Sequence, residues 1–192
     1  VDTGMDADAL NTCLARLGID RINVLVLSHF DADHVGAVNA VIGRVDLALF
    51  GPPGSPDDEA IIDSLAAAGA EVTLVTEGFS GSPGDARWQV LWPRAESRAF
   101  GAGNDSSVVV AVRGGGIPSV LMLGDLSASA QRALLASNAP GTFDVVKVAH
   151  HGSADQEPRV YQEAAASVAL ISVGVENTYG HPRDEILAVL DD

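Results

Sequence analysis

Hydrophobic and polar residues follow two regular spacings along the chain, and together they predict a mixed α/β protein. Short apolar or β-branched runs bounded by Gly, Pro or charged residues are typical of buried strands. Such runs predict strands at Ile22–Leu27, Asp46–Phe50, Glu71–Val75, Trp88–Trp92, Ser107–Val112, Ser119–Leu123, Val145–Val148 and Val168–Val173. Between them, apolar residues recur at helical spacing and predict helices at Asp6–Leu17, Val35–Gly43, Asp57–Ala68, Ser127–Leu135, Pro158–Ala166 and Arg183–Leu190.

The order of these elements favours two sheets faced by helices over a single doubly wound sheet. The three glycines 114–116 predict a hairpin between neighbouring strands, and crossovers through helices occur elsewhere along the chain. A chain of 192 residues, of which 47% are hydrophobic, is long enough to fold as one domain, 1–192, with a sizeable core. We therefore expect a layered α/β sandwich.

Cysteine content and hydropathy narrow the class of protein further. The single cysteine, Cys13, excludes an internal disulfide and a cysteine-based metal site, and its place in the first predicted helix indicates a small core residue. No apolar run reaches the ~18 residues needed to cross a membrane, so we expect no direct membrane insertion by this segment. Because the sequence starts at Val1 without a Met, we expect a fragment of a larger protein.

The acidic balance restricts how the protein meets nucleic acid. The formal net charge is −15, from 26 acidic and 11 basic residues, and Lys147 is the one lysine. This excludes a broad basic surface for non-specific nucleic-acid binding. It leaves open a nuclease in which metal ions and a few arginines hold the phosphates locally.

One stretch, Ser28 to Gly36, concentrates groups that bind metals. It places His29, Asp31, Asp33 and His34 directly after the predicted strand Ile22–Leu27. Four such groups in one turn repel each other and compete for solvation unless a cation compensates them. The alternative, a polar loop with an Asp helix cap, requires one carboxylate and no histidine.

The remaining histidines and one aspartate also follow strands or lie in loops before helices. In layered α/β folds the ends of strands hold functional side chains rigidly. We expect Asp125 to bridge two metals, which such sites hold ~3.5–4 Å apart, although alone it reads as a turn residue. Of His150 and His151, one is expected to be a ligand and the other to face substrate. His181 is expected to contact substrate, the alternative being a loop hydrogen bond.

The motifs that carry this chemistry resemble those of the metallo-β-lactamase superfamily, whose marker is His-X-His-X-Asp-His. More narrowly, the chain resembles the soluble domain of ComEC-type competence proteins, the channels that take up DNA. The resemblance runs in order through Asp2-Thr3-Gly4, Ser28-His29-Phe30-Asp31-Ala32-Asp33-His34-Val35-Gly36, Asn104-Asp105-Ser106-Ser107, Leu123-Gly124-Asp125, Val146-Lys147-Val148-Ala149-His150-His151-Gly152-Ser153 and Tyr179-Gly180-His181-Pro182.

The resemblance implies an αββα sandwich and a site with two divalent metal ions. The implied ligands come from all the main motifs: His29 and Asp31 for one ion, Asp33, His34 and His151 for the other, and Asp125 between them. Asp2 is implied to orient a ligand rather than to bind metal. The residues implied in the catalytic steps are Asp33, His150 and His181.

Two departures from the superfamily pattern concern the metals. Asp31 stands where the marker has its second histidine, and Asn104 or Asp105 occupies the stretch of the usual third-motif histidine, as a weak ligand or an orienting residue. Both changes replace nitrogen by oxygen, which favours harder ions such as Mn²⁺ over Zn²⁺. Ala37 follows Gly36 where the family often has a second glycine, and we expect a methyl group to fit there.

The resemblance implies a metal-dependent phosphodiesterase, most directly a nuclease that degrades the DNA strand not taken up. It further implies single-stranded DNA as the favoured partner, a tether to the channel domain of the same protein, and a place on the extracytoplasmic face of the membrane. The alternatives are a metallo-hydrolase of small esters, phosphoesters or lactams, a non-catalytic domain that binds DNA or the channel, and a purely structural metal. The last would usually be four-coordinate and cysteine-rich.

Overall fold

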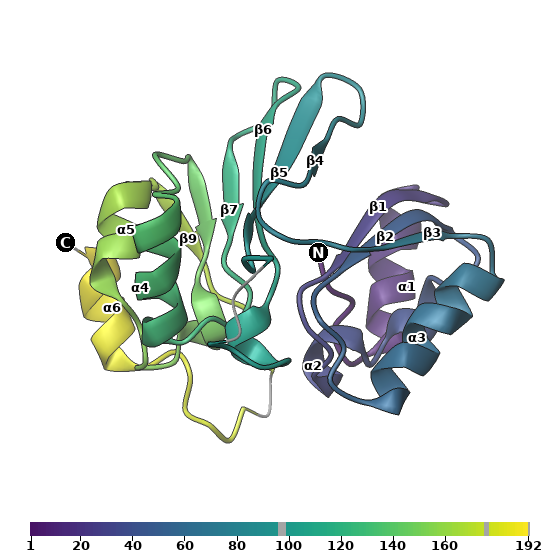
Figure 1. Cartoon of the computed structure of the whole chain (residues 1–192), viewed down its shortest axis with the longest axis horizontal. Helices are drawn as coiled ribbons and strands as arrows, with labels where there is room; N and C mark the ends of the chain where they lie inside the picture. The colour runs from purple at the N-terminus through teal and green to yellow at the C-terminus, as the bar shows by residue number, and fades with distance from the viewer. Residues whose placement is uncertain (96–98, 175–176, 192) are drawn as a thin grey trace. The chain divides into compact units, whose positions relative to one another are not determined.

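The computed structural model describes residues 1–95, 99–174 and 177–191. The chain divides into two compact units, Val1–Val75 with Gly101–Val108, and Thr76–Phe100 with Val109–Asp192 (Figure 1). Each unit has its own sheet, its own helices and its own apolar core, which confirms the mixed α/β class. Within the described residues, no helix is both long and apolar enough to span a membrane.

The first unit is built on a parallel sheet of three strands in the order β1-β2-β3. Its strands are β1 (Ile22–Leu27), β2 (Val45–Phe50) and β3 (Glu71–Leu74). Its helices are α1 (Ala7–Arg16), α2 (Ala32–Val35) and α3 (Pro56–Ala67), with short 3₁₀ helices η1 (Val38–Ala40) and η2 (Asn104–Ser106). The near-continuous apolar runs of β1 and β2 follow from burial on both faces of a parallel sheet.

The core of this unit corrects one prediction about α1. Leu10 and Leu14 face the apolar cluster around Leu27, Phe50 and Leu65, whereas Cys13 is exposed. The prediction that Cys13 is a core residue is therefore wrong. Leu10 and Leu14 are four residues apart and share a helix face, whereas Cys13 is turned away from that face by about a quarter-turn of the helix.

The second unit is built on a six-stranded sheet in the order β4-β5-β6-β7-β8-β9. Its strands are β4 (Ser80–Gly81), β5 (Ala86–Trp92), β6 (Val109–Gly114), β7 (Val120–Met122), β8 (Val145–Lys147) and β9 (Val168–Leu170). Pairing is antiparallel from β4 to β7 and parallel from β7 to β9. The parallel part therefore brings the carboxyl ends of three strands to one edge of the sheet.

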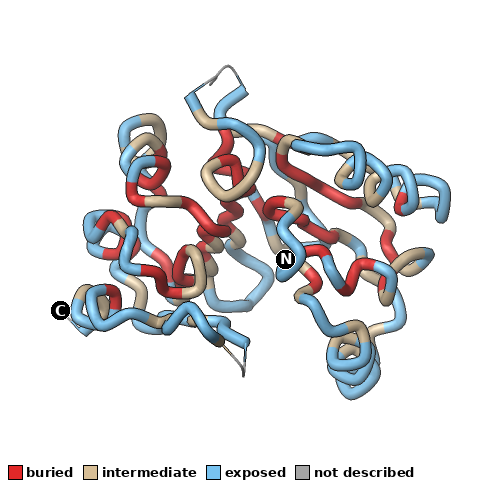
Figure 2. Tube along the Cα trace, turned by 90° about the horizontal axis from the view of Figure 1, so that it is seen from below, coloured by how far each residue is buried: buried red, intermediate tan, exposed pale blue. Residues whose placement is uncertain are grey.

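Three helices of the second unit cover this sheet and close its core. They are α4 (Ala128–Ser137), α5 (Pro158–Ala164) and α6 (Asp184–Asp191), and Figure 1 shows them together on one side of the strands. Leu121 and Val146 of the sheet pack with Leu134, Val160 and Ile186 of the helices. Figure 2 shows the buried residues in red on inner segments of the chain and exposed residues in pale blue on its outer coils.

Two predicted elements differ from the structure in ways that affect the site. The helix predicted from Val35 to Gly43 is α2 followed by η1, and it begins earlier, so that Asp33 and His34 lie on the helix rather than in a turn. It breaks because Ala37 N–H donates to Gly4 O (2.8 Å) instead of continuing the helix. The strand predicted from Ser107 starts at Val109, because Val108 N–H donates to Ser28 O (2.8 Å).

Candidate metal centre

In the first unit, the end of β1 and the short helix α2 hold two histidine–aspartate pairs. His29 lies two residues after the end of β1, and its Nε2 lies 3.5 Å from Oδ2 of Asp31. On α2, Nε2 of His34 lies 3.6 Å from Oδ2 of Asp33. The rings of His29 and His34 are 4.0 Å apart, and both histidines are buried while the two carboxylates are exposed.

Asp2 determines which nitrogen of His34 is available to a metal. Its Oδ2 lies 3.0 Å from Nδ1 of His34, and its Oδ1 accepts from the backbone N–H of Ser28 (2.7 Å). A carboxylate only accepts hydrogen bonds, so the proton of His34 sits on Nδ1 and the lone pair on Nε2. Asp2 thus fixes the ring of His34 with Nε2 available, in the way that carboxylates commonly orient metal-binding histidines.

Two buried serines orient the ring of His29 in the same way. Ser28 Oγ donates to Oδ2 of Asp2 (2.9 Å), which leaves its oxygen to accept from Nδ1 of His29 (3.1 Å). Ser107 Oγ lies 3.3 Å from the same nitrogen. Because Nδ1 is engaged on this side, the lone pair of His29 is on Nε2, the nitrogen that faces Asp31.

The segment before α1 is held by hydrogen bonds to both β1 and α2. Asp2 N–H donates to Val26 O of β1 (2.7 Å), and Thr3 donates to His34 O through its N–H (2.8 Å) and its hydroxyl (3.0 Å). Ala37 is fully buried against this segment, so the expected methyl group fits.

In the second unit, the parallel strands β7, β8 and β9 bring three groups to one edge. Asp125 follows β7, His151 follows β8, and Ser172 follows β9. Nδ1 of His151 donates to the backbone carbonyl of Ser172 (2.7 Å), so in the neutral ring the lone pair is on Nε2, which lies 3.3 Å from Oδ2 of buried Asp125. The Asp125 carboxylate raises the pKa of His151, so a metal at this nitrogen has to displace a proton.

A second group in this unit consists of His150, Tyr179 and His181. The ring of His181 lies 5.9 Å from those of both His150 and Tyr179. Gly152 allows this approach, because at its φ of +80° a Cβ would lie 2.8 Å from Cβ of Pro182. Burial lowers the pKa of His181, with a smaller contribution from His150, which favours its neutral form.

Left-handed backbone conformations mark the predicted site residues. Among the described residues, four non-glycine residues have positive φ, and three of them are Asp2 (56°), His150 (45°) and His151 (53°). Each such conformation costs on the order of 1–3 kcal/mol and persists only where the surroundings enforce it, which is typical of functional sites.

The donor atoms fit divalent ions within each unit. An ion with bonds of about 2.1 Å at tetrahedral angles holds its donors about 3.4 Å apart. The three Nε2–Oδ2 separations are 3.5, 3.6 and 3.3 Å, and each joins an imidazole lone pair to a carboxylate. Two electron-rich atoms at this distance repel each other unless a proton or a metal ion lies between them.

Three further groups lie near the predicted ligands: the pair Asn104 and Asp105, the side chain of Ser107 and the backbone carbonyl of Ser172. Asn104 and Asp105 lie in η2. The side chain that reaches His29 from this stretch is that of Ser107, the residue after η2. Their role as weak ligands stays a prediction. The contributions of Ser107 and of the Ser172 carbonyl were not predicted, since neither a common residue nor a backbone oxygen carries a recognisable signal.

Comparisons with known proteins give independent evidence on the family of the chain. A family model described as the metallo-beta-lactamase superfamily matches residues 1–165. The chain is 30% identical over 182 residues to ComE operon protein 3 of Bacillus subtilis (strain 168), covering 92% of the chain and 23% of that protein. It is 29% identical over 199 residues to competence protein ComA of Neisseria gonorrhoeae, covering 96% of the chain and 25% of that protein.

The chain therefore spans about a quarter of the length of these curated relatives. Among solved structures, the metallo-beta-lactamase fold protein YhfI from Bacillus subtilis matches with a TM-score of 0.51 and 11% identity. That match covers 99% of the chain and 78% of YhfI. At this identity the likeness concerns the fold alone.

Proposed function

The chain belongs to the metallo-β-lactamase superfamily, whose members are typically metal-dependent hydrolases, and on that premise we propose that it is a metal-dependent phosphodiesterase acting on DNA. The observation that carries the proposal is the repeated pairing of an oriented histidine Nε2 with a carboxylate oxygen in both units. The similarity to competence proteins supports DNA as the substrate.

We propose that the metal ligands take the roles that the superfamily motifs imply. His29 and Asp31 would hold one ion, Asp33, His34 and His151 the other, and Asp125 would bridge them. The oxygen-rich ligand set favours Mn²⁺ beside Zn²⁺. When bound, the ions supply an activated water and neutralise charge on the phosphate.

The remaining residues act directly on the substrate in this proposal. His150 and His181 lie beside each other and can hydrogen bond a phosphate oxygen or protonate the leaving oxygen. The lowered pKa of His181 keeps its ring neutral near pH 7, so it acts as a hydrogen-bond partner unless a proton reaches it from a neighbour. The exposed carboxylate of Asp33 is close enough to His34 to share its ion.

The setting of the activity is also part of the proposal. Because the chain spans about a quarter of its competence-protein relatives, we propose that it works tethered to a channel domain of a longer protein. The expected place is the extracytoplasmic face of the membrane, with single-stranded DNA favoured.

The test combines metal analysis with hydrolysis of chemically distinct substrates. Protein purified without chelator is analysed for bound metal, then stripped and reloaded with Mn²⁺, Zn²⁺ or Mg²⁺. Single-stranded DNA, bis-p-nitrophenyl phosphate and the lactam nitrocefin are offered in turn. We expect hydrolysis of the two phosphodiesters and none of the lactam.

Matched variants make the test decisive. Asp125→Ala is expected to abolish hydrolysis, whereas Asp63→Ala, which removes an exposed carboxylate from α3, is expected to leave it unchanged. Circular dichroism checks that both variants fold. Full activity of folded Asp125→Ala would favour a non-catalytic binding domain, and turnover of nitrocefin alone would favour a small-ester or lactam hydrolase.

A further inference from the structure

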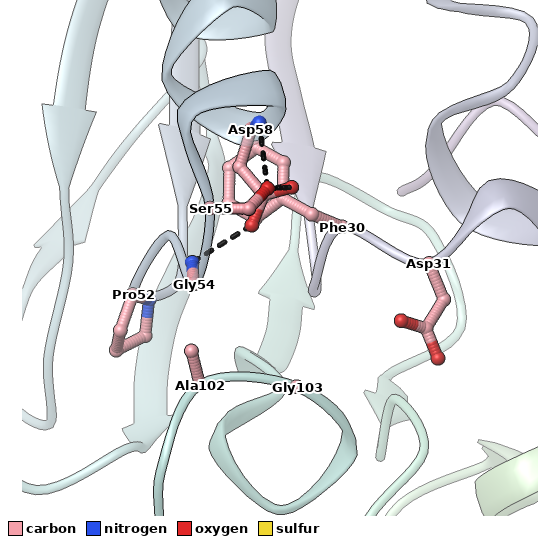
Figure 3. A pocket seen from close by; sticks show the side chains of 8 residues that line it. All are labelled: Phe30, Asp31, Pro52, Gly54, Ser55, Asp58, Ala102 and Gly103. Atoms are coloured by element: carbon pink, nitrogen blue, oxygen red, sulfur yellow. Dashed lines mark hydrogen bonds between the residues drawn. The ribbon is translucent and has the colours of Figure 1, made fainter.

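A pocket of about 260 Å³ lies in the first unit, immediately beside Asp31. It is lined by Phe30, Asp31, Pro52, Gly54, Ser55, Asp58, Ala102 and Gly103. Figure 3 shows Phe30, Ser55 and Asp58 on one side and Ala102 and Gly103 on the other, with Pro52 and Asp31 at opposite ends. Its volume is just below the ~300–1,000 Å³ typical of small-molecule sites, so it suits a single ring system.

The walls of the pocket are held by interactions within this unit. Asp58 accepts from Gly54 N–H (2.7 Å) and from Ser55 Oγ (2.7 Å), and Ser55 Oγ accepts from Asp58 N–H (3.2 Å). Ser55 thus caps the start of α3, and Asp58 reaches back to fix the loop that precedes the helix. Gly54 is needed there, since a Cβ would lie 2.9 Å from Cβ of Ala102.

The chemistry of the lining combines an aromatic ring with hydrogen-bond acceptors. Phe30 is partly buried and its ring lies 6.3 Å from that of Phe50, so it is held in place as a flat apolar wall. The polar side chains are Asp31, Ser55 and Asp58, and no basic side chain is among the described lining residues. Such a lining attracts a flat group with N–H donors and repels a phosphate.

We propose that this pocket binds the nucleobase of the nucleotide next to the scissile phosphate, with preference for bases that carry an amino group. The inference rests on the proposed function, because Asp31 is both a pocket wall and a partner of His29 at the expected ion. A phosphate at the ion places the adjoining base within reach of this wall. Carboxylates accept from the amino group of cytosine, whereas thymine presents a carbonyl oxygen at the same position.

This role also fits the acidic composition of the chain. A protein with a net charge of −15 gains little from phosphate contacts away from its metals. Stacking of a base on an aromatic side chain does not depend on charge and contributes substantially to the binding of single strands. The pocket therefore supplies affinity that the surface charge does not.

The test uses chromogenic diesters that differ only in the base. The substrates are the 5′-(p-nitrophenyl phosphate) esters of deoxycytidine and thymidine, and methyl p-nitrophenyl phosphate, which has no base. We expect the KM of the deoxycytidine ester to be about tenfold below that of the thymidine ester. The base-free ester is expected to have the highest KM of the three.

Two variants of the same chemical kind separate the pocket from general effects. Ala102→Phe places a ring in the pocket from an exposed loop position and is expected to bring the KM ratio of the two nucleoside esters close to one. Ala67→Phe, at the last residue of α3 and also exposed, is expected to keep the ratio of the wild-type protein. Equal KM values in the wild-type protein, or an unchanged ratio in Ala102→Phe, would overturn the proposal.

A binding measurement keeps the pocket testable if no ester is hydrolysed, an outcome that would refute the proposed function instead. Deoxycytidine without phosphate is titrated into chelator-treated protein and followed by amide NMR. We expect shifts at Phe30, Gly54 and Gly103 that disappear in Ala102→Phe. Absence of these shifts in the wild-type protein would overturn the assignment of the pocket, whatever the activity.

Discussion

Replacing Asp2 by Asn tests whether a single oxygen determines which nitrogen of His34 is available to a metal. Oδ1 of Asp2 accepts from the Ser28 backbone N–H (2.7 Å), a position that only an oxygen can fill. The amide nitrogen of Asn therefore takes the place of Oδ2, 3.0 Å from Nδ1 of His34. Since that nitrogen donates, Nδ1 has to accept, and the proton of the neutral ring moves to Nε2.

The magnitude follows from the contacts that change and those that remain. The Ser28 N–H bond persists, and the Ser28 hydroxyl, which donates to Oδ2 of Asp2, turns to accept from the new amide nitrogen. The left-handed backbone of Asp2 (φ 56°) suits Asn equally well, so we expect the fold to lose only about 1 kcal/mol. Metal binding loses more, because Nε2 now carries a proton toward the ion. Changes in such orienting partners typically cost 10–100-fold in metal affinity, which corresponds to about 1.4–2.8 kcal/mol.

Two measurements follow this change directly. Competition with a chelating indicator gives the affinity for Zn²⁺ or Mn²⁺, and ¹⁵N NMR of the histidine rings in metal-free protein gives the tautomer of His34. Asp46→Asn serves as the control, because it makes the same chemical change on β2, where Asp46 forms a surface ion pair with Arg21. Affinity of Asp2→Asn within twofold of wild type, or a proton still on Nδ1, would refute the reasoning.

Three further predictions concern the second unit and the charge of the chain. Gly152→Ala is expected to destabilise the fold by more than Gly18→Ala, as measured by denaturant unfolding. Both variants place an alanine in a left-handed conformation, which costs about 1–2 kcal/mol, but only the Cβ at position 152 would lie 2.8 Å from Pro182. In metal-free protein, the raised pKa of His151 stabilises the fold at pH values below the ordinary histidine pKa of about 6.5. This stabilisation is lost as the pH rises through the raised pKa of the folded protein. Asp125→Asn should reduce the loss and lower the pKa of His151 measured by NMR. Oligonucleotide binding should be weak and decline with salt as expected for few phosphate contacts, and a tight complex insensitive to salt would contradict this.

The parts of the site that could be predicted from sequence are those anchored by strand ends. The apolar run of β1 predicts a buried strand, and the crowding of His29 to His34 after it predicts a cation. Asp125 and His151 follow β7 and β8 in the same way, and the parallel pairing of these strands places them together. For Asp125 and His151, the local sequence pattern and the pairing of β7 with β8 therefore predict the same edge of the second unit's sheet.

Other features depended on tertiary contacts that no local pattern encodes. Ser107 reaches His29 across 78 positions of sequence, and the partner of His151 is a backbone oxygen. The break between α2 and η1 arises because Ala37 bonds to Gly4, far away in the chain. The left-handed conformations of His150 and His151 are likewise imposed by their surroundings, since residue type alone favours glycine there.

The exposure of Cys13 on α1 has a practical consequence for handling the protein. As the sole thiol of the chain, it can link two copies through oxidation and produce a dimer unrelated to biology. Dithiol reductants prevent this but compete for zinc, so metal loading calls for a phosphine reductant instead. The same thiol accepts one fluorophore or nitroxide at one defined place, without any mutation to remove others.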